Sequence, residues 1–319
     1  MEIINMIKFR KASVCSFLLI AFLSACTVES EEKKVLSTLC PDLKLQVLGS
    51  GGPEIDDGLA SSSFLIWIEK KAVVMIDAGG GSSLNFEKSG VNFNDLQAIL
   101  LTHLHVDHSA ALPIYIKAGY FTGRESLLSI YGPAQGGDFP STEDFISALF
   151  SDQQKSAYPY LSDNFRQQPS TDFLMAGHSV SSNNQPWSKK LSEQLSISAI
   201  NVEHGAIPAI AWRVDYRGCS ITFSGDMNGE SGNLKKIAKE TNLLVANNAI
   251  PQQSNRFAKA LHMTPQTIGM IASKAKVKKL LLAHFMNRTN FKKKETILEI
   301  KKNYKGEIIL SEDLMIVFP

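Results

Sequence analysis

The sequence has few cysteines and almost no net charge, and each shortage excludes a class of protein. Four cysteines in 319 residues are too few for a disulfide-built scaffold. With 33 basic and 31 acidic residues the formal net charge is +2, too even for a protein dedicated to binding nucleic acid. The hydrophobic fraction of 44% and the charged fraction of 20% exclude wholesale disorder and a collagen-like chain. The composition is that of a globular protein with one large domain or two small ones.

The apolar run near the start of the chain is too short to cross a membrane. It occupies residues 12–22, follows Lys8, Arg10 and Lys11, and falls well short of the roughly 20 residues that a membrane helix needs. A basic segment, a short apolar segment and small residues before a break are typical of a secretory signal. A short transmembrane anchor is the alternative interpretation.

The end of this segment, Leu-Ser-Ala-Cys at residues 23–26, resembles the lipobox of bacterial lipoproteins. The resemblance implies that residues 1–25 are a signal peptide and that a lipid is attached to Cys26 after cleavage. Residues 26–44 then form a lipidated tether. On this interpretation the protein is anchored by its lipid in the bacterial cell envelope and faces the periplasm. The outer membrane is favoured because Thr27 rather than Asp follows the cysteine.

Removal of residues 1–25 changes the balance of charge and cysteine. The segment contains three basic residues and one acidic residue, so the remaining chain has no net charge. Neutrality argues against nucleic acid as a partner, because a substrate with many phosphates calls for a basic surface. Cys40 and Cys219 remain, either joined in a disulfide or as two separate buried thiols.

Strand and helix patterns alternate along residues 45–319, which predicts an α/β domain. The predicted strands are 45–48, 62–68, 72–76, 96–101, 127–131, 195–202, 210–216, 219–224, 243–246 and 279–283, with short terminal strands near Ile308 and Ile316. The predicted helices begin at Asp107 and Thr264 or span residues 145–150, 233–240 and 294–304.

The pattern loosens between residues 132 and 190, where Pro, Ser, Asn and Gln are frequent. We interpret this insert as a candidate lid. Its aromatic residues either form a specificity surface or make a satellite core beneath a long loop. These residues are Phe145, Phe150, Tyr158 and Tyr160.

Side chains that can bind metal are concentrated after one strand. His103, His105, Asp107 and His108 lie within six residues directly after the strand 96–101. Imidazole and carboxylate are suitable ligands for zinc. A single cluster of this kind binds metal only if further ligands come from elsewhere in the fold.

Further ligands follow three other predicted strands. His204 follows the strand 195–202, and Asp226 and His284 follow two later strands. Sites in α/β proteins lie outside the carboxyl ends of the strands, so we expect all these side chains to converge.

The motif His-x-His-x-Asp-His after a strand, with later His, Gly-Asp and His motifs, resembles the metallo-β-lactamase superfamily over nearly all of residues 45–319. The resemblance implies a four-layer αββα sandwich with a dinuclear metal site at one edge. It implies two Zn²⁺ ions, with Mn²⁺ or Fe²⁺ as alternatives. One metal is expected to bind His103, His105 and His204, and the other Asp107, His108 and His284. Asp226 is expected to bridge the metals, and Asp77 to orient a ligand histidine.

Within the superfamily, Ser-Gly-Asp around Asp226 is similar to the branch of ribonuclease Z, cyclic-nucleotide phosphodiesterase and alkyl/aryl-sulfatase. His262 resembles the extra histidine of ribonuclease Z that assists proton transfer. The candidate catalytic residues are His262 and Asp107. A polar residue at the start of a helix is the alternative for His262. Two departures argue against tRNA processing. Only the hairpin 214–223 stands where ribonuclease Z has a tRNA-gripping arm, and Asn247-Asn248 stands where it has a His-Glu pair.

The leading hypothesis is a dinuclear zinc hydrolase in which a metal-bridging hydroxide attacks a small-molecule ester. A phosphodiester or a sulfate ester is favoured. The alternatives are a lactone or β-lactam hydrolase and a non-catalytic zinc-binding envelope lipoprotein.

Overall fold

The computed structural model describes residues 40–152, 155–165, 174–182 and 184–319. The predicted signal peptide 1–25, the lipidation site Cys26 and most of the tether 26–44 lie outside the described residues. Within the described part of the chain, no helix is both long and apolar enough to cross a membrane. Cys40 and Cys219 are both disulfide-bonded, which excludes two free thiols.

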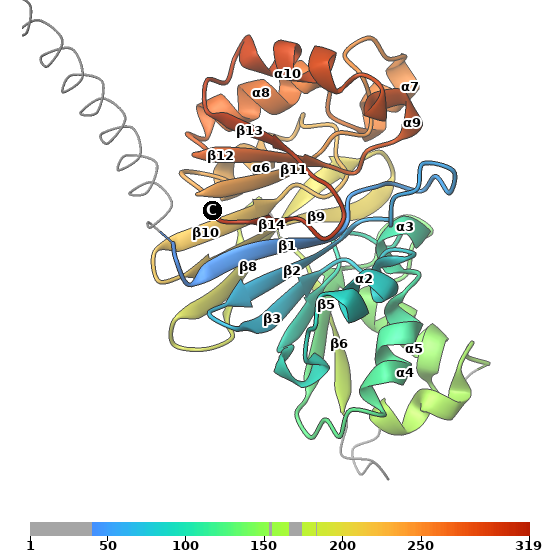
Figure 1. Cartoon of the computed structure of the whole chain (residues 1–319). Coiled ribbons are helices and arrows are strands. Elements are labelled where there is room, and N and C mark those ends of the chain that lie inside the picture. Colours follow the sequence, from blue (N-terminus) through green and yellow to red (C-terminus); the bar gives the residue numbers. More distant parts are fainter. Residues whose placement is uncertain (1–39, 153–154, 166–173, 183) are drawn as a thin grey trace, which may run out of the picture. The chain divides into compact units, whose positions relative to one another are not determined.

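Two mixed β-sheets, each with seven described strands, form the centre of the unit 42–319 (Figure 1). The first sheet has the order β14-β1-β2-β3-β4-β5-β6. Its strands are β1 (Leu43–Gly49), β2 (Ser63–Ile68), β3 (Lys71–Ile76), β4 (Ala98–Leu100), β5 (Leu128–Pro133), β6 (Met175–Val180) and β14 (Ile316–Val317). The second sheet has the order β13-β12-β11-β10-β9-β8-β7. Its strands are β7 (Trp187–Lys190), β8 (Leu195–His204), β9 (Ile207–Tyr216), β10 (Cys219–Phe223), β11 (Leu243–Asn247), β12 (Lys279–Ala283) and β13 (Glu307–Leu310).

The two sheets have the same internal plan. In the first, β14 to β3 are antiparallel and β3 to β6 are parallel. In the second, β7 to β10 are antiparallel and β10 to β13 are parallel. The chain therefore forms two similar halves, and the carboxyl ends of several strands in both sheets point to one edge of the sandwich.

Helices cover the outer face of each sheet. The first half has α2 (Ser82–Lys88), α3 (Val106–Ser109), α4 (Leu112–Gly119), α5 (Thr142–Phe150) and the 3₁₀ helices η1 (Phe93–Asp95) and η2 (Pro159–Phe165). The second half has α6 (Asn233–Ile237), α7 (Arg256–Leu261), α8 (Pro265–Lys274), α9 (Asn287–Asn290) and α10 (Lys293–Lys301). Figure 1 shows α8 and α10 above the second sheet and α4 and α5 beside the first. The layers are helix, sheet, sheet and helix, which confirms the predicted sandwich.

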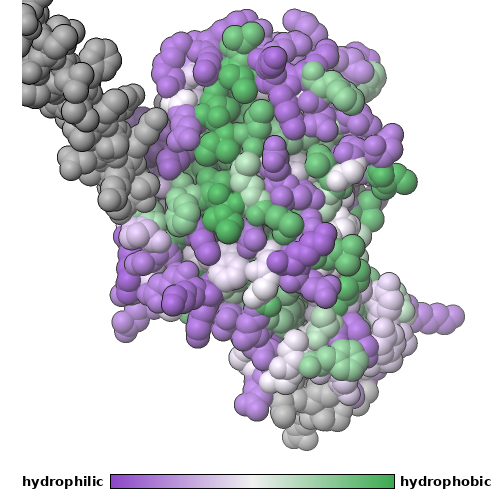
Figure 2. Space-filling view, in the orientation of Figure 1, coloured by the Kyte–Doolittle hydropathy of each residue, from purple (hydrophilic) through white to green (hydrophobic). Residues whose placement is uncertain are grey.

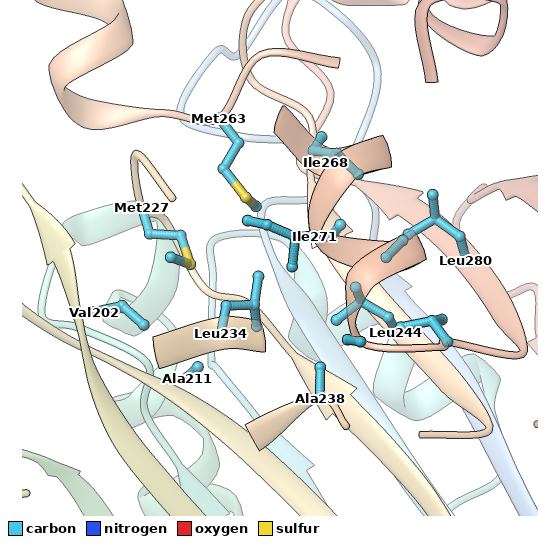
Figure 3. Packing of buried hydrophobic residues seen from close by; sticks show 14 of the residues in the cluster. Val202, Ala211, Met227, Leu234, Ala238, Leu244, Met263, Ile268, Ile271 and Leu280 are labelled. Carbon is cyan, nitrogen blue, oxygen red and sulfur yellow. The ribbon is translucent and has the colours of Figure 1, made fainter. Parts of the chain in front are cut away.

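Apolar side chains hold these layers together. In the second half, Leu234 and Ile271 from helices pack on Leu244 and Leu280 from the sheet, as Figure 3 shows. Between the sheets, the rings of Phe64 and Phe223 lie 5.5 Å apart. Figure 2 shows hydrophilic side chains over most of the visible face, with a hydrophobic strip beside the C-terminus.

The insert 132–190 contributes regular elements to both sheets. Its described residues form α5, η2 and the edge strands β6 and β7, none of which except α5 was predicted. Phe150 is completely buried and belongs to the main core of the first half rather than to a separate satellite core, whereas Tyr160 is 65% exposed.

Candidate metal centre

The structure brings all seven predicted metal ligands together at the shared edge of the sheets. They form overlapping groups in which the potential ligand atoms lie within 4.8 Å of one another. Two of these groups are the sets that the resemblance implies for the two metals, namely His103, His105 and His204, and Asp107, His108 and His284. Two further groups contain Asp226, one with His103 and His108 and the other with His204 and His262. Asp226 thus neighbours potential ligands of both sets, namely His103 and His204 of the first and His108 of the second.

The turn after β4 is held in place by hydrogen bonds to Asp77. The Asp77 carboxylate, directly after β3, accepts hydrogen bonds from the Thr102 backbone N–H at 2.7 Å and from the Thr102 hydroxyl at 2.9 Å. It also accepts a hydrogen bond from Nδ1 of His108, at 2.7 Å. Because Nδ1 is engaged in this way, His108 presents Nε2 to the cluster. Asp77 therefore occupies the orienting position that the resemblance implies.

His204, from the second half of the fold, is oriented by a backbone carbonyl of that same half. Its Nδ1 donates a hydrogen bond of 2.8 Å to the carbonyl oxygen of Leu261, at the end of α7. Its Nε2 consequently faces Asp226 Oδ2, at 3.8 Å. The carbonyl of Leu261 is a contribution that sequence reasoning missed, because a backbone group leaves no signal in the residue type.

The other oxygen of Asp226 is held by Asn247, the last residue of β11. Asn247 Nδ2 donates a hydrogen bond of 2.7 Å to Asp226 Oδ1. Asp226 Oδ2 remains directed at the cluster, 3.4 Å from His284 Nε2 and 3.6 Å from His262 Nδ1. Asn247, which stands where the resemblance would place the first residue of a His-Glu pair, thus fixes a carboxylate of the cluster.

The donor atoms of the cluster fit a divalent metal. Among the described residues, Nε2 of His103, His108 and His204 is buried without a hydrogen-bond partner. Leaving buried polar atoms unpaired costs free energy, about 1–3 kcal/mol each. Imidazole nitrogens beside ionised carboxylates are the ligands that zinc and related cations prefer. The residues present therefore fit the metals that the resemblance implies.

The carboxylates and imidazoles of the cluster shift one another's pKa values. Burial raises the pKa of Asp107, but the hydrogen bond from His284 and the nearby His108 outweigh it and lower the pKa to about 2. Burial lowers the pKa of His108, but Asp77, Asp107 and Asp226 together raise it to about 9. Burial is also the main cause that holds the pKa of His103 well below its usual value.

His262 lies at the end of α7 and borders the cluster. Its side chain is 12% exposed, against 3% for Asp226. Burial is the main cause that lowers the pKa of His262 to about 4, with His284, His204 and Arg288 acting in the same direction against Asp226. A neutral imidazole at the mouth of a cluster of ligands can accept a proton or pass one on.

The chain resembles curated ribonucleases in sequence and several solved structures in fold. Ribonuclease Z of Enterococcus faecalis is 25% identical over 304 residues, which cover 82% of this chain and 94% of that protein. The metallo-beta-lactamase fold protein YhfI from Bacillus subtilis has a TM-score of 0.65 at 18% identity and covers 86% of this chain and 98% of its own. The short form of human tRNase Z has a TM-score of 0.62 at 23% identity and covers 86% of this chain and 99% of its own. The two structures share the fold of this chain.

These relatives overturn two expectations drawn from the sequence. The prediction that nucleic acid is not a partner is wrong, because the curated relatives are ribonucleases. Net charge failed as a guide because it averages over the whole surface, whereas RNA is bound locally. The expected location, lipid-anchored in the bacterial cell envelope through Cys26, is contradicted by the same relatives. That expectation rested on a basic and apolar segment and on the motif Leu-Ser-Ala-Cys at residues 23–26, all of which lie outside the described part of the chain.

The sequence model of one protein family, the metallo-beta-lactamase superfamily, matches residues 56–261 of this chain. The match covers more than half of the chain. The matched segment contains Asp77, the motif 103–108, His204 and Asp226. The chain belongs to the metallo-beta-lactamase superfamily and is a hydrolase.

Proposed function

We propose that this hydrolase is a phosphodiesterase that cleaves RNA, using a dinuclear metal centre built from the seven clustered ligands. The observation that carries the proposal is the position of Asp226, which belongs to groups of potential ligands on both sides of the cluster and lies 3.6 Å from His262. The similarity to ribonuclease Z over most of both chains supports RNA as the substrate class. Zn²⁺ is our first choice of metal, with Mn²⁺ and Fe²⁺ as alternatives.

A pair of divalent cations bound here supplies a water of lowered pKa and neutralises the negative charge that develops on the phosphate. The residues around the ligands keep the site in one geometry before substrate arrives. Asp77 fixes the ring of His108, the carbonyl of Leu261 fixes the ring of His204, and Asn247 fixes the carboxylate of Asp226. Such supporting contacts typically change metal affinity or activity 10- to 100-fold when they are removed.

His262, a neutral imidazole because its pKa is lowered to about 4, is placed to orient the oxygen that leaves the phosphate and to pass a proton on to it. It borders Asp226 but is more exposed than that carboxylate, so a substrate in the mouth of the site can reach it. Asp107 is hydrogen-bonded to His284 Nε2 at 3.1 Å and stays ionised because its pKa is lowered to about 2. Asp107 thus keeps its negative charge in the cluster over the whole physiological pH range, where it would help to hold a divalent cation.

The full chain, loaded with Zn²⁺ or Mn²⁺, tests the proposal on a single-stranded RNA oligonucleotide and on bis(p-nitrophenyl) phosphate. We expect both to be hydrolysed and Asp226→Asn to abolish both activities. His262→Ala is expected to lower kcat by about 10²- to 10⁴-fold while leaving the metal content unchanged. His178→Gln is the matched control, because His178 stacks on Tyr131 outside the cluster and should have no effect. A wild-type protein that holds two metals and cleaves no phosphodiester would overturn the proposal.

A further inference from the structure

Three exposed aromatic rings surround one lysine at the carboxyl end of α4. The Nζ atom of Lys117 lies 4.8 Å from the ring centroid of Tyr120, 4.9 Å from that of Phe121 and 5.3 Å from that of Tyr160. The three aromatic residues are 49%, 74% and 65% exposed, respectively. We call these four residues the aromatic platform.

The positions of buried and exposed residues along α4 show why the platform faces solvent. Leu112, Tyr115 and Ile116 are buried in the core of the first half, and they lie on one face of the helix. Lys117 and the residues just beyond the helix, Tyr120 and Phe121, lie outside that face. Large apolar side chains scattered singly over a surface are ordinary, but a cluster of them marks an interaction site.

The third ring is held in place by the core. Tyr158 and Tyr160, both in or next to η2, have ring centroids 6.5 Å apart. Tyr158 in turn lies 6.1 Å from Phe150, which is completely buried. This chain of ring contacts fixes Tyr160 beside α4, so that two separate elements present one surface.

The ammonium group of Lys117 has a positive charge to offer a ligand. Its contacts are with ring faces, and in the described ranges no carboxylate lies within ion-pair distance of it. The ring faces stabilise the cation without neutralising its charge. A phosphate group can therefore bind Lys117 while flat groups stack on the neighbouring rings.

We propose that the aromatic platform binds a single-stranded segment of the RNA substrate, with bases stacked on the rings and a phosphate paired with Lys117. Exposed aromatic rings beside a cation are the usual means by which proteins hold single strands without reading their sequence. A lipid surface or a protein partner would be expected to bury a continuous apolar patch, whereas here the cation lies at the centre of the rings. This inference rests on the proposed function insofar as it takes RNA as the substrate.

The platform lies at the end of α4 that is farther from the candidate metal centre, so one RNA molecule could contact both. Helix α4 begins next to the cluster, because the N–H of Ala111 donates a hydrogen bond to the carbonyl of Ala78, the neighbour of Asp77. Figure 1 shows α4 extending away from α3 toward the outer end of the first half. Eight residues of helix span about 12 Å. A segment of a few nucleotides is long enough to span that length.

The test compares two substrates in the metal-loaded full chain, a 12-nucleotide single-stranded RNA and bis(p-nitrophenyl) phosphate. We expect Phe121→Ala, Tyr120→Ala and Tyr160→Ala each to raise KM for the RNA by about 5- to 150-fold, the equivalent of one lost stacking contact. KM and kcat for the small phosphodiester should not change. Phe121→Trp should retain the wild-type KM, and Phe318→Ala, which removes an exposed ring elsewhere, is the matched control.

Two further measurements test the role of Lys117 and the dependence on the length of the RNA. Lys117→Gln should reduce the slope of log affinity against log salt by about 0.7, the value for one phosphate contact on a single strand. For a dinucleotide substrate, which is too short to reach the platform, all the variants should match wild type. An RNA KM that is unchanged in the three alanine variants would overturn the inference and leave the proposed function standing.

Failure of the proposed function has a different signature. If the wild-type protein hydrolyses neither substrate, fluorescence anisotropy with the same labelled RNA still measures the platform. Weaker RNA binding by Phe121→Ala than by Phe318→Ala would then support the platform alone. Equal binding by these two variants would overturn it.

Discussion

Asn247 and Asp226 are joined by a buried hydrogen bond of 2.7 Å from the amide nitrogen Nδ2 to the carboxylate oxygen Oδ1. This contact fixes the rotation of the carboxylate, so that Oδ2 is the oxygen directed at His284 and His262. An asparagine can make this contact at any pH because its amide does not titrate. The last residue of β11 therefore holds a carboxylate of the candidate metal centre in one orientation.

Asn247→Ala removes this support and leaves Asp226 Oδ1 buried without a partner. We expect activity on a small phosphodiester to fall by about 10- to 100-fold and the metal content to fall with it. Asn242→Ala is the matched control, because Asn242 precedes the same strand and accepts a hydrogen bond of 3.0 Å from the Ser220 N–H at its other end. The control should lower thermal stability but leave kcat unchanged. Equal loss of kcat in both variants would contradict the positioning role of Asn247.

Asp77→Asn tests the orientation of His108. The substitution keeps the shape of the side chain but removes the negative charge that most strongly raises the pKa of His108. It also replaces one of the two oxygens that accept hydrogen bonds from Thr102 and His108 with a donor nitrogen. We expect Zn²⁺ affinity, measured by competition with a chromogenic chelator, to weaken about 10- to 100-fold. Asp95→Asn breaks the surface contact with Lys71 and should leave Zn²⁺ affinity unchanged. Unchanged affinity in Asp77→Asn would show that His108 needs no orienting partner.

Much of the fold could be predicted because its strands are apolar and end at clear turn signals. The strand predicted at 279–283 coincides with β12, and the helix predicted from Thr264 is α8, capped by that threonine. The edge strands β6 and β7 were missed. β6 contains Gly177 and His178 and β7 contains Lys189, so neither has the apolar run of a buried strand. They form strands because a neighbouring strand pairs with their backbone, which is a tertiary effect.

The convergence of the candidate ligands was predictable because they are of distinctive residue types and follow strands. The residues that support these ligands were harder to find. Asp77 was inferred from the resemblance, whereas Thr102, whose hydroxyl contacts Asp77, had no signal beyond its place before His103. The aromatic platform could not be predicted at all, since the spacing of Lys117 and Tyr160 along the chain says nothing about their contact.

Arg124 is a stabilising residue remote from the metal centre, at the amino ends of the parallel strands. Its guanidinium is buried and donates hydrogen bonds to four backbone carbonyls, those of Phe93, Leu96, Ser126 and Leu127. A lysine cannot supply this planar set of donors, so Arg124→Lys should lower the free energy of unfolding by about 3 kcal/mol. Urea unfolding measures the loss, and kcat should be unaffected. Arg256→Lys, on the surface of α7, is the control and should change stability by less than about 0.5 kcal/mol.

Tyr304 gives the protein a predictable loss of stability in alkali. Burial, assisted by Glu307, raises the pKa of Tyr304 from 10.0 to about 12, and its hydroxyl donates a hydrogen bond of 2.9 Å to the carbonyl of Lys278. Between these two pKa values the unfolded chain has lost the phenolic proton and the folded protein has kept it. The stability contribution is therefore fully present below pH 10 and is lost as the pH rises through 12.

Tyr304→Phe removes the titrating group and separates its effect from that of the other tyrosines. At pH 8 the variant should be less stable than wild type by about 1 kcal/mol, because the hydrogen bond to Lys278 is lost. Between pH 10 and pH 12 the difference in the free energy of unfolding should shrink, because only the wild-type protein has a group at residue 304 that ionises more easily in the unfolded chain. The measurement is the free energy of unfolding in urea at intervals of half a pH unit. A wild-type advantage that stays constant up to pH 12 would show that Tyr304 ionises at the same pH in both states.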